Sequence, residues 1–392
     1  MSLLRTVSSS FFPTRARIAG VLAAALAATV PMAPPAFAQT PSSPPAAARL
    51  PLTTTAQLLA GVMPKGKLAA NPVVADIVAG PAWRAHRAAA RAGARQLRIR
   101  LAHMHAWEAR HLPPTRGTLL YPFSGPDLIN AYALFPDADT YVFFSLEPVG
   151  TVPRLGGLDD SGRAALFHDL RAALNDFVAL NFFITPDMAE KLQTDSLNGT
   201  VPVLLAMMGV LNLHVDAIRP YDPFSGKAGA RPGHPVRGVR IAFTNPRNGH
   251  HQTLIYLAIN VGDHALRHRH PGFLPWLRTF RNPTVLIKSA SYLLHEPHFR
   301  LLRAELLSRS RVIVQDDSGI PYRMLKNAGY AVRLFGHYQE PVKLFHNYSQ
   351  PDLEDAYTKA GALPALPFPF GYNWRKEGGS GLILAVRPRG QS

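Results

Sequence analysis

Apolar positions along this chain recur with two different periods, which predict both helices and strands. Residues 71–112 are rich in Ala, Arg and Leu and predict a helix, with Pro81 suited to a helix start. Residues 161–182 predict a second helix, because Leu166, Leu170, Leu174, Phe177 and Val178 recur at helical spacing. Residues 201–215 are the most apolar stretch after the N-terminus and predict a buried helix.

Short runs rich in β-branched and aromatic residues predict strands. They cover residues 117–123, 141–146, 239–244, 253–261, 285–289, 312–315, 331–335 and 382–386. Asn248 and Gly249, between two of these runs, indicate a hairpin. Since hairpin-like pairs stand beside strand–helix steps, the chain predicts an α/β fold of mixed α+β character, with a mixed, partly antiparallel sheet and packed helices.

The first residues have a different pattern, which is typical of a secretory signal. Basic Arg5, Arg15 and Arg17 precede a short apolar run, and the small-residue site Ala36-Phe37-Ala38 follows it. The run is too short to cross a bilayer, which needs about 20 residues. Residues 1–38 are therefore predicted to be a cleavable signal peptide, and the mature protein is expected to be periplasmic or extracellular.

The rest of the chain is expected to hold one folded domain. Residues 39–70 begin with a stretch rich in Pro, Ala, Ser and Thr and are predicted to form a disordered tether. Residues 71–392 are predicted to be a single globular domain, with a joint in the Pro- and Gly-rich residues 221–235. No later apolar run reaches the length of a span, so no transmembrane segment is expected after signal removal.

Composition and charge limit the chemical classes of site and binding partner that this chain can have. The chain has no cysteine, which excludes disulfides, thiolate nucleophiles and thiolate metal sites. Its formal net charge is +17, which favours an anionic partner. Because DNA is a poor partner for an exported protein, an anionic component of the cell envelope is expected and nucleic acid is not.

Five arginines share one face of the predicted helix over residues 71–112. Their spacings of 3, 4, 4 and 3 residues match the helical repeat. They are Arg84, Arg87, Arg91, Arg95 and Arg98. Two interpretations stay open: a solvated helix face, or an anion-binding stripe for phospholipid or acidic glycan.

Signatures of several enzyme classes are missing. The chain lacks G-x-S-x-G, S-x-x-K, H-E-x-x-H, a Walker A loop and G-x-G-x-x-G. His103 with His105, and His264 with His268 and His270, are the best groups for a metal, but neither supplies a complete ligand set. No metal site is predicted, and no cofactor is indicated.

Two polar loops follow predicted strands, where ligand-binding and catalytic groups are often found. In the first loop, Ser124 or Asp127 can cap the next helix, and the same geometry would make an anion-binding end. In the second loop, Asp316 and Asp317 precede Ser318. This loop is either an Asx-turn or a functional pair, in which one carboxylate is a base or cation ligand and the other orients it.

Two hypotheses about function follow. The first is an exported envelope enzyme, a hydrolase acting on a glycan or related substrate, whose loops converge in one cleft. Its candidate catalytic residues are Asp316, Asp317, Asp127, Glu147, Ser124 and Ser318. The second is a non-catalytic envelope module that binds anionic lipid or glycan through the arginine stripe.

Three short sequence segments resemble those of a known group of proteins. Residues 121–127, 146–150 and 315–321 make the chain similar to a family of exported bacterial proteins with no established activity. The resemblance covers most of the predicted mature chain. It supports the prediction of export and implies no mechanism.

Overall fold

The computed structural model describes residues 50–66, 69–180, 190–224, 237–372 and 379–388, without the side chains of residues 175–180. The predicted signal peptide, residues 1–38, lies outside this part of the chain, as does most of the predicted joint at 221–235. Within the described ranges, every helix is too short or too polar to span a lipid bilayer.

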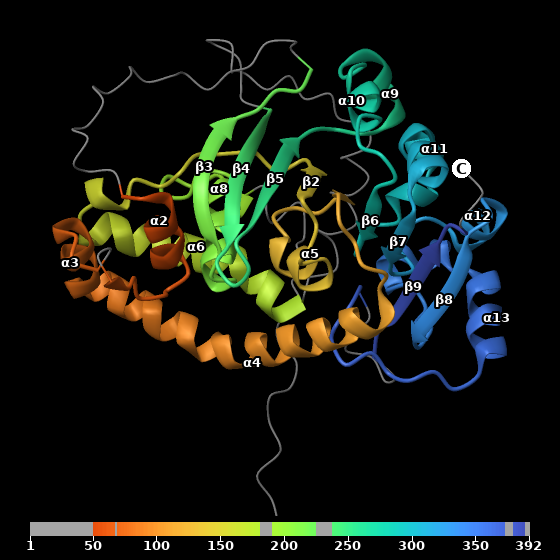
Figure 1. Ribbon diagram of the computed structural model, residues 1–392, viewed down its shortest axis with the longest axis horizontal. Helices are drawn as coiled ribbons and strands as arrows, with labels where there is room; N and C mark the ends of the chain where they lie inside the picture. The colour runs from red at the N-terminus through yellow and green to blue at the C-terminus, as the bar shows by residue number, and fades with distance from the viewer. Residues whose placement is uncertain (1–49, 67–68, 181–189, 225–236, 373–378, 389–392) are drawn as a thin grey trace, which may run out of the picture. The chain divides into compact units, whose positions relative to one another are not determined.

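The described residues form one nine-stranded sheet in the order β3-β4-β5-β2-β1-β6-β7-β9-β8 (Figure 1). The strands are β1 (Thr118–Pro122), β2 (Thr140–Ser145), β3 (His214–Pro220), β4 (Gly238–Asn245), β5 (His250–Ala258), β6 (Thr284–Ile287), β7 (Val312–Gln315), β8 (Ala331–Gly336) and β9 (Gly381–Val386). The five central strands are parallel, and antiparallel pairs flank them. This confirms the predicted α/β class with a mixed, partly antiparallel sheet.

Helices cover both faces of the sheet, so the parallel strands are apolar on both sides. The first face carries α2 (Leu52–Leu59), α4 (Pro81–His111), α5 (Leu128–Leu134), α6 (Asp160–Leu180) and α8 (Val201–Val210), and α3 (Pro72–Ala79) packs beside α4. The second face carries α9 (Asp263–His268), α10 (Phe273–Leu277), α11 (Arg300–Arg309), α12 (Tyr322–Asn327) and α13 (Pro351–Ala360).

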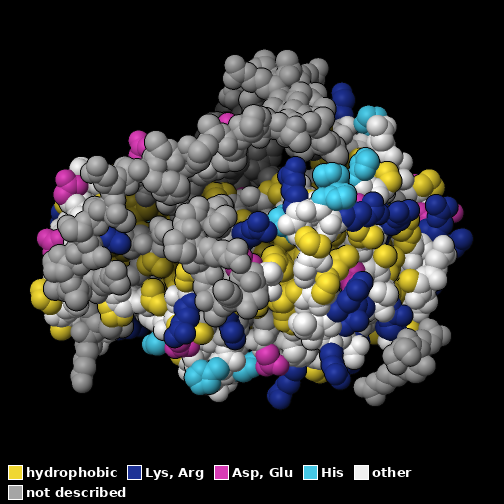
Figure 2. All heavy atoms as spheres, turned by 90° about the horizontal axis from the view of Figure 1, so that it is seen from above, with side chains coloured by type: hydrophobic (Ala, Val, Ile, Leu, Met, Phe, Trp, Pro, Cys, Tyr) yellow, Lys and Arg dark blue, Asp and Glu magenta, His cyan; other side chains and the backbone are white. Residues whose placement is uncertain are grey.

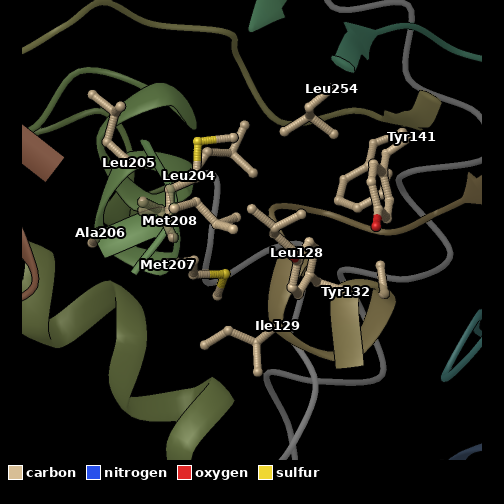
Figure 3. Packing of buried hydrophobic residues seen from close by; sticks show 14 of the residues in the cluster. Leu128, Ile129, Tyr132, Tyr141, Leu204, Leu205, Ala206, Met207, Met208 and Leu254 are labelled. Atoms are coloured by element: carbon tan, nitrogen blue, oxygen red, sulfur yellow. The ribbon is translucent and has the colours of Figure 1, made fainter. Parts of the chain in front are cut away.

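The core of the first face is densely packed around α5 and α8. Helix α8 is buried on almost all sides, which its uniformly apolar sequence requires. Its Met207 and Met208 lie among side chains of α5, such as Leu128 and Ile129, as Figure 3 shows. This packing fixes α5, whose N-terminus lies at the carboxyl edge of the sheet.

The chain leaves the two central strands toward opposite faces. Strand β1 leads into α5 on the first face, whereas β6 leads through two short 3₁₀ turns, Leu293–His295 and Pro297–Phe299, to α11 on the second face. In chain order, the parallel strands are arranged 3-2-1-4-5, with β1 and β6 at the switch point. Ligands of doubly wound sheets bind outside the carboxyl ends of such strands. Residues 123–127 and 288–292 therefore lie where a ligand is expected.

The predicted tether, residues 39–70, is wrong over part of its length. Residues 52–59 form α2, which packs against α8 and buries Ala56, Leu58 and Leu59 completely or nearly so. Thr54 and Thr55 are also buried, and the Thr55 hydroxyl donates a hydrogen bond of 3.2 Å to the Pro51 carbonyl. The composition of this segment, which is rich in Thr and Ala, therefore led to a prediction of disorder where a short buried helix forms.

The predicted helix over residues 201–215 is also too long. Helix α8 ends at Val210, and Asn212 adopts a left-handed conformation with φ of 56°. This residue reverses the chain, and strand β3 begins two residues later. Asparagine tolerates the left-handed region better than most residues, so the break occurs there.

Candidate functional site

Asp127 closes the loop after β1 and caps α5. Its Oδ1 accepts a hydrogen bond of 3.1 Å from the backbone N–H of Asn130, which is the capping role considered for this loop. Its Oδ2 accepts a hydrogen bond of 2.8 Å from the Tyr121 hydroxyl. The residue is only 1% exposed, so its carboxylate depends on these partners.

Lys288, the residue after β6, provides the opposite charge. Its Nζ lies 3.1 Å from Oδ2 of Asp127, and both side chains are buried. Burial lowers the pKa of Lys288, while the nearby charges of Asp127 and Asp316 oppose this effect. Arg100 of α4 also interacts electrostatically with Asp127. Burial lowers the pKa of Arg100, and the charge of Asp127 opposes this effect. The pair therefore joins β1 to β6 at the switch point.

Asp316 follows β7 and forms an Asx-turn, which is one of the two interpretations of this loop. Its Oδ1 accepts hydrogen bonds from the backbone N–H and the hydroxyl of Ser318, at 3.1 and 2.5 Å. Its Oδ2 accepts one of 2.9 Å from the backbone N–H of Ser289. Burial raises the pKa of Asp316, and the bonds from Ser318 and Ser289 counteract this. The carboxyl thus ties the loop after β7 to the loop after β6.

Asp316 and Asp317 both line one pocket, although neighbours in an extended strand would point apart. The chain turns at Asp316, where the Gly319 N–H donates a hydrogen bond of 3.3 Å to the Asp316 carbonyl, and both residues contribute to the pocket wall. The Tyr292 hydroxyl donates a hydrogen bond to Asp317 Oδ2. Other lining residues include His337, Tyr338, Tyr357, Gly371 and Tyr372.

The loops at the switch point contain unusual backbone conformations. Phe123 lies after β1, and Ser289, Ser291 and Tyr292 lie after β6; all four have φ between 51° and 58°. Tyr372 holds the second loop, because its hydroxyl donates to the Ser289 carbonyl at 2.7 Å and accepts from the Ser291 N–H at 3.0 Å. Non-glycine residues in this region cluster at functional sites.

The serine hydroxyls have distinct roles. The Ser124 hydroxyl donates to the Gly125 carbonyl at 2.9 Å within its own loop. The Ser318 hydroxyl donates to Asp316 and accepts from the Ala290 N–H at 2.8 Å, so it shapes the turn. Ser289, which sequence reasoning did not select, has a buried Oγ without a hydrogen-bond partner among the described residues.

Glu147 lies at the same edge of the sheet but apart from the Asp127–Lys288 pair. It follows β2, is 3% exposed, and its Oε2 has no hydrogen-bond partner in the described part of the chain. Its charge, together with burial, raises the pKa of Tyr256 on β5. All six candidate residues thus follow carboxyl ends of parallel strands. Asp127, Asp316, Asp317 and Ser318 belong to the linked network, whereas the Ser124 hydroxyl bonds within its own loop.

The arginine stripe faces outward. Arg84, Arg91, Arg95 and Arg98 are exposed, and Arg87 lies over the Trp83 ring at 5.3 Å from its centroid. The opposite side of α4 is buried through Trp83, His86, Met104 and Trp107. A different face, seen in Figure 2, also carries many Lys, Arg and His side chains with few acidic ones among them.

The histidine groups considered for metal binding do not assemble a site in the described residues. His264 and His268 share a face of α9, with ring centroids 4.7 Å apart. Among the residues that the structure describes, no three His, Asp or Glu side chains gather closely enough to hold a metal ion.

No protein-family model, curated protein or solved structure matches this chain. The geometry of the carboxyl edge therefore carries the functional argument alone.

Proposed function

We propose that the protein is an exported hydrolase that cleaves a glycan or a related substrate of the cell envelope. The observation that carries the proposal is that two acidic residues, Asp316 and Asp317, line one pocket beside the switch point. Two carboxyls in one pocket are the minimum set for acid–base cleavage of a glycosidic bond.

The two carboxyls lie in different environments, which suits different roles. Asp316 is buried, and its raised pKa makes it the better proton donor to the leaving oxygen. Asp317 is half-buried and receives a hydrogen bond from Tyr292, which orients it as the base for water. Lys288 and Asp127 act as positioning residues, because they hold the loop that supplies the Ser289 N–H to Asp316.

The other walls of the pocket combine aromatic and polar groups. Tyr338, Tyr357 and Tyr372 present aromatic rings and His337 adds a polar side chain. Aromatic faces pack against the C–H groups of a sugar ring, while hydroxyl and imidazole groups exchange hydrogen bonds with its hydroxyls. The export signal predicted from the sequence would bring the enzyme to such substrates.

The test is the release of reducing ends from a panel of envelope glycans by the purified protein. Wild-type protein should release them, whereas Asp317→Asn and Asp316→Asn should reduce the rate by at least about a hundredfold. Asp195→Asn, a change of the same kind at an exposed position, should keep full activity. Equal rates for Asp317→Asn and Asp195→Asn would refute the assignment.

A second candidate function rests on a separate observation, the exposure of the arginine stripe on α4. Four outward-facing guanidinium groups on one helix side would attract anionic lipid or acidic glycan. This role would make the protein a non-catalytic envelope module, or would hold the hydrolase close to its substrate.

A further inference from the structure

We infer that the pocket lined by Asp316 and Asp317 selects a sugar that carries a protonated amino group, so that the substrate class is an amino sugar. The inference rests on the proposed function for the sugar and adds the charge that the pocket recognises. It is drawn from the wall of the pocket, where acidic and aromatic residues occur together.

The wall of the pocket has an acidic character. Asp316 and Asp317 line it, whereas no Lys or Arg is among the lining residues that the structure describes. The ammonium of Lys288 acts on Asp316 from outside the wall, but it is buried and lies 3.1 Å from the carboxylate of Asp127. In a chain with a formal net charge of +17, this wall therefore has the opposite sign.

The negative charge of Asp317 acts on the aromatic part of the wall. Burial is the main cause of the raised pKa of Tyr338, Tyr357 and Tyr372, and the charge of Asp317 raises the pKa of all three further. The charge of Glu354 adds to this effect at Tyr338. A potential that disfavours a phenolate at these positions favours a cation beside them.

The tyrosines are held in place around the pocket. The Tyr357 hydroxyl donates to the Phe335 carbonyl at 3.1 Å, and the Tyr357 ring centroid lies 6.1 Å from that of Tyr338. The Tyr372 hydroxyl donates to the Ser289 carbonyl at 2.7 Å. An ammonium within about 6 Å of an aromatic ring is attracted by the π electrons of that ring. Carboxylates and such rings together suit a ligand that is cationic and donates hydrogen bonds.

The charge of the sugar decides between three classes of ligand. A sugar acid would place a second negative charge beside Asp317, which is unfavourable in a partly buried site. A neutral sugar would gain the contacts with the tyrosines but no attraction between charges. An amino sugar gains both, and the pocket therefore discriminates in its favour.

The test is isothermal titration of the wild-type protein with methyl glucosaminide and with methyl glucoside. These two probes differ only at one carbon, which carries an ammonium in the first and a hydroxyl in the second at about pH 6. We expect methyl glucosaminide to bind at least about tenfold more tightly. Added salt should weaken the binding of methyl glucosaminide and leave that of methyl glucoside nearly unchanged, because salt screens charges.

Two variants assign the preference to the pocket. Asp317→Asn should bind both probes alike, since the charge that distinguishes them is gone. Asp195→Asn, the same change at an exposed position, should keep the preference of wild type. The salt dependence is measured on wild type, so the test stands even where Asp317→Asn does not fold.

The outcomes separate this inference from the proposed hydrolase. The inference is overturned by equal binding of the two probes to wild type, by binding of neither, by salt-independent binding of methyl glucosaminide, or by a preference that persists in folded Asp317→Asn. Hydrolysis of neutral glycans that depends on Asp317, together with equal binding of the probes, would overturn the inference and leave the hydrolase standing. A preference for methyl glucosaminide without hydrolysis of any glycan would support the amino-sugar pocket and count against the hydrolase.

Discussion

The ammonium of Lys288 lies 3.1 Å from the carboxylate of Asp127, in the interior of the protein between β1 and β6. A buried ion pair must offset the loss of hydration of both charges, and it does so only with further hydrogen bonds. Asp127 has these from Tyr121 and from the backbone and side chain of Asn130. The pair fixes the relative positions of two strained loops at the carboxyl edge.

Removal of one member of this pair should be strongly destabilising. Lys288→Met leaves the Asp127 carboxylate buried without its ammonium partner, and we expect a loss of about 3–5 kcal/mol in the free energy of unfolding by urea. Adding Asp127→Asn to Lys288→Met should recover part of the loss, because the uncompensated charge is gone. A double variant less stable than Lys288→Met would show that the charges are not coupled.

Gly371 makes a close approach to Asp316 that only glycine allows. A Cβ there would be 2.6 Å from Oδ2 of Asp316, and the residue has φ of 75°. Gly371→Ala should lower the free energy of unfolding by about 1–2 kcal/mol because of the left-handed conformation alone. Displacement of Asp316 should lower it further and should also reduce the rate of hydrolysis. Gly379→Ala is the matched control, because its φ is 79° and nothing lies within 4 Å. Equal losses in stability and activity for both variants would argue against the contact.

His86 should make the protein less stable in acid. Its Nε2 donates to the Leu59 carbonyl at 2.9 Å, and its Nδ1 faces Arg171 at 3.3 Å, so the ring is neutral. Desolvation by burial lowers the pKa of His86 from 6.5 to about 4. As the pH falls, His86 is therefore protonated in the unfolded chain before it is protonated in the folded protein. The free energy of unfolding should be highest above pH 6.5 and should fall by up to about 3 kcal/mol as the pH drops toward 4.

Urea unfolding between pH 7 and pH 4 measures this effect (roughly the span of the two pKa values). His86→Phe keeps the stacking on Phe167 and should reduce the pH dependence. His298→Phe, at an exposed position, should leave the slope unchanged. An unaltered slope in His86→Phe would assign the acid sensitivity to other groups.

The arginine stripe should bind anionic vesicles in a salt-sensitive way. Replacing Arg87, Arg91 and Arg95 with Gln should abolish co-sedimentation with such vesicles at low salt, because it removes the positive charges that attract the lipid. Added salt should weaken the binding of wild type, because exposed charges are screened over about 10 Å at 0.1 M salt. The same charge change at Arg267, Arg269 and Arg281 provides the control, since all three are exposed away from α4. Equal losses in both triple variants would indicate attraction by net charge rather than by the stripe.

Local patterns were sufficient to predict much of the fold. The strands around residues 117–123 and 141–146, the hairpin at Asn248, and the helix start at Pro81 all lie close to their predicted places. Such elements were predictable because their signals are local: period, turn residues and helix caps. The carboxylates of the loops after β1, β2 and β7 were found for the same reason.

The remaining features depend on contacts between distant parts of the chain. Lys288 was read as part of a strand over residues 285–289, and only the pairing of β6 with β1 reveals its partner Asp127. Helix α2 was missed because its burial comes from α8, about 150 residues later. A charged residue directly after an apolar strand, as at Lys288, was the one sequence signal that could have identified it.

The pocket beside Asp316 and Asp317 is proposed to bind an envelope glycan. The most direct measurement is the thermal midpoint of the purified protein with and without envelope glycan fragments. Since each kcal/mol of binding energy moves the midpoint by about 2–4 °C, a bound fragment should raise it measurably in wild type and Asp195→Asn, but not in Asp317→Asn. An unchanged midpoint in wild type, or an equal rise in Asp317→Asn, would contradict the claim.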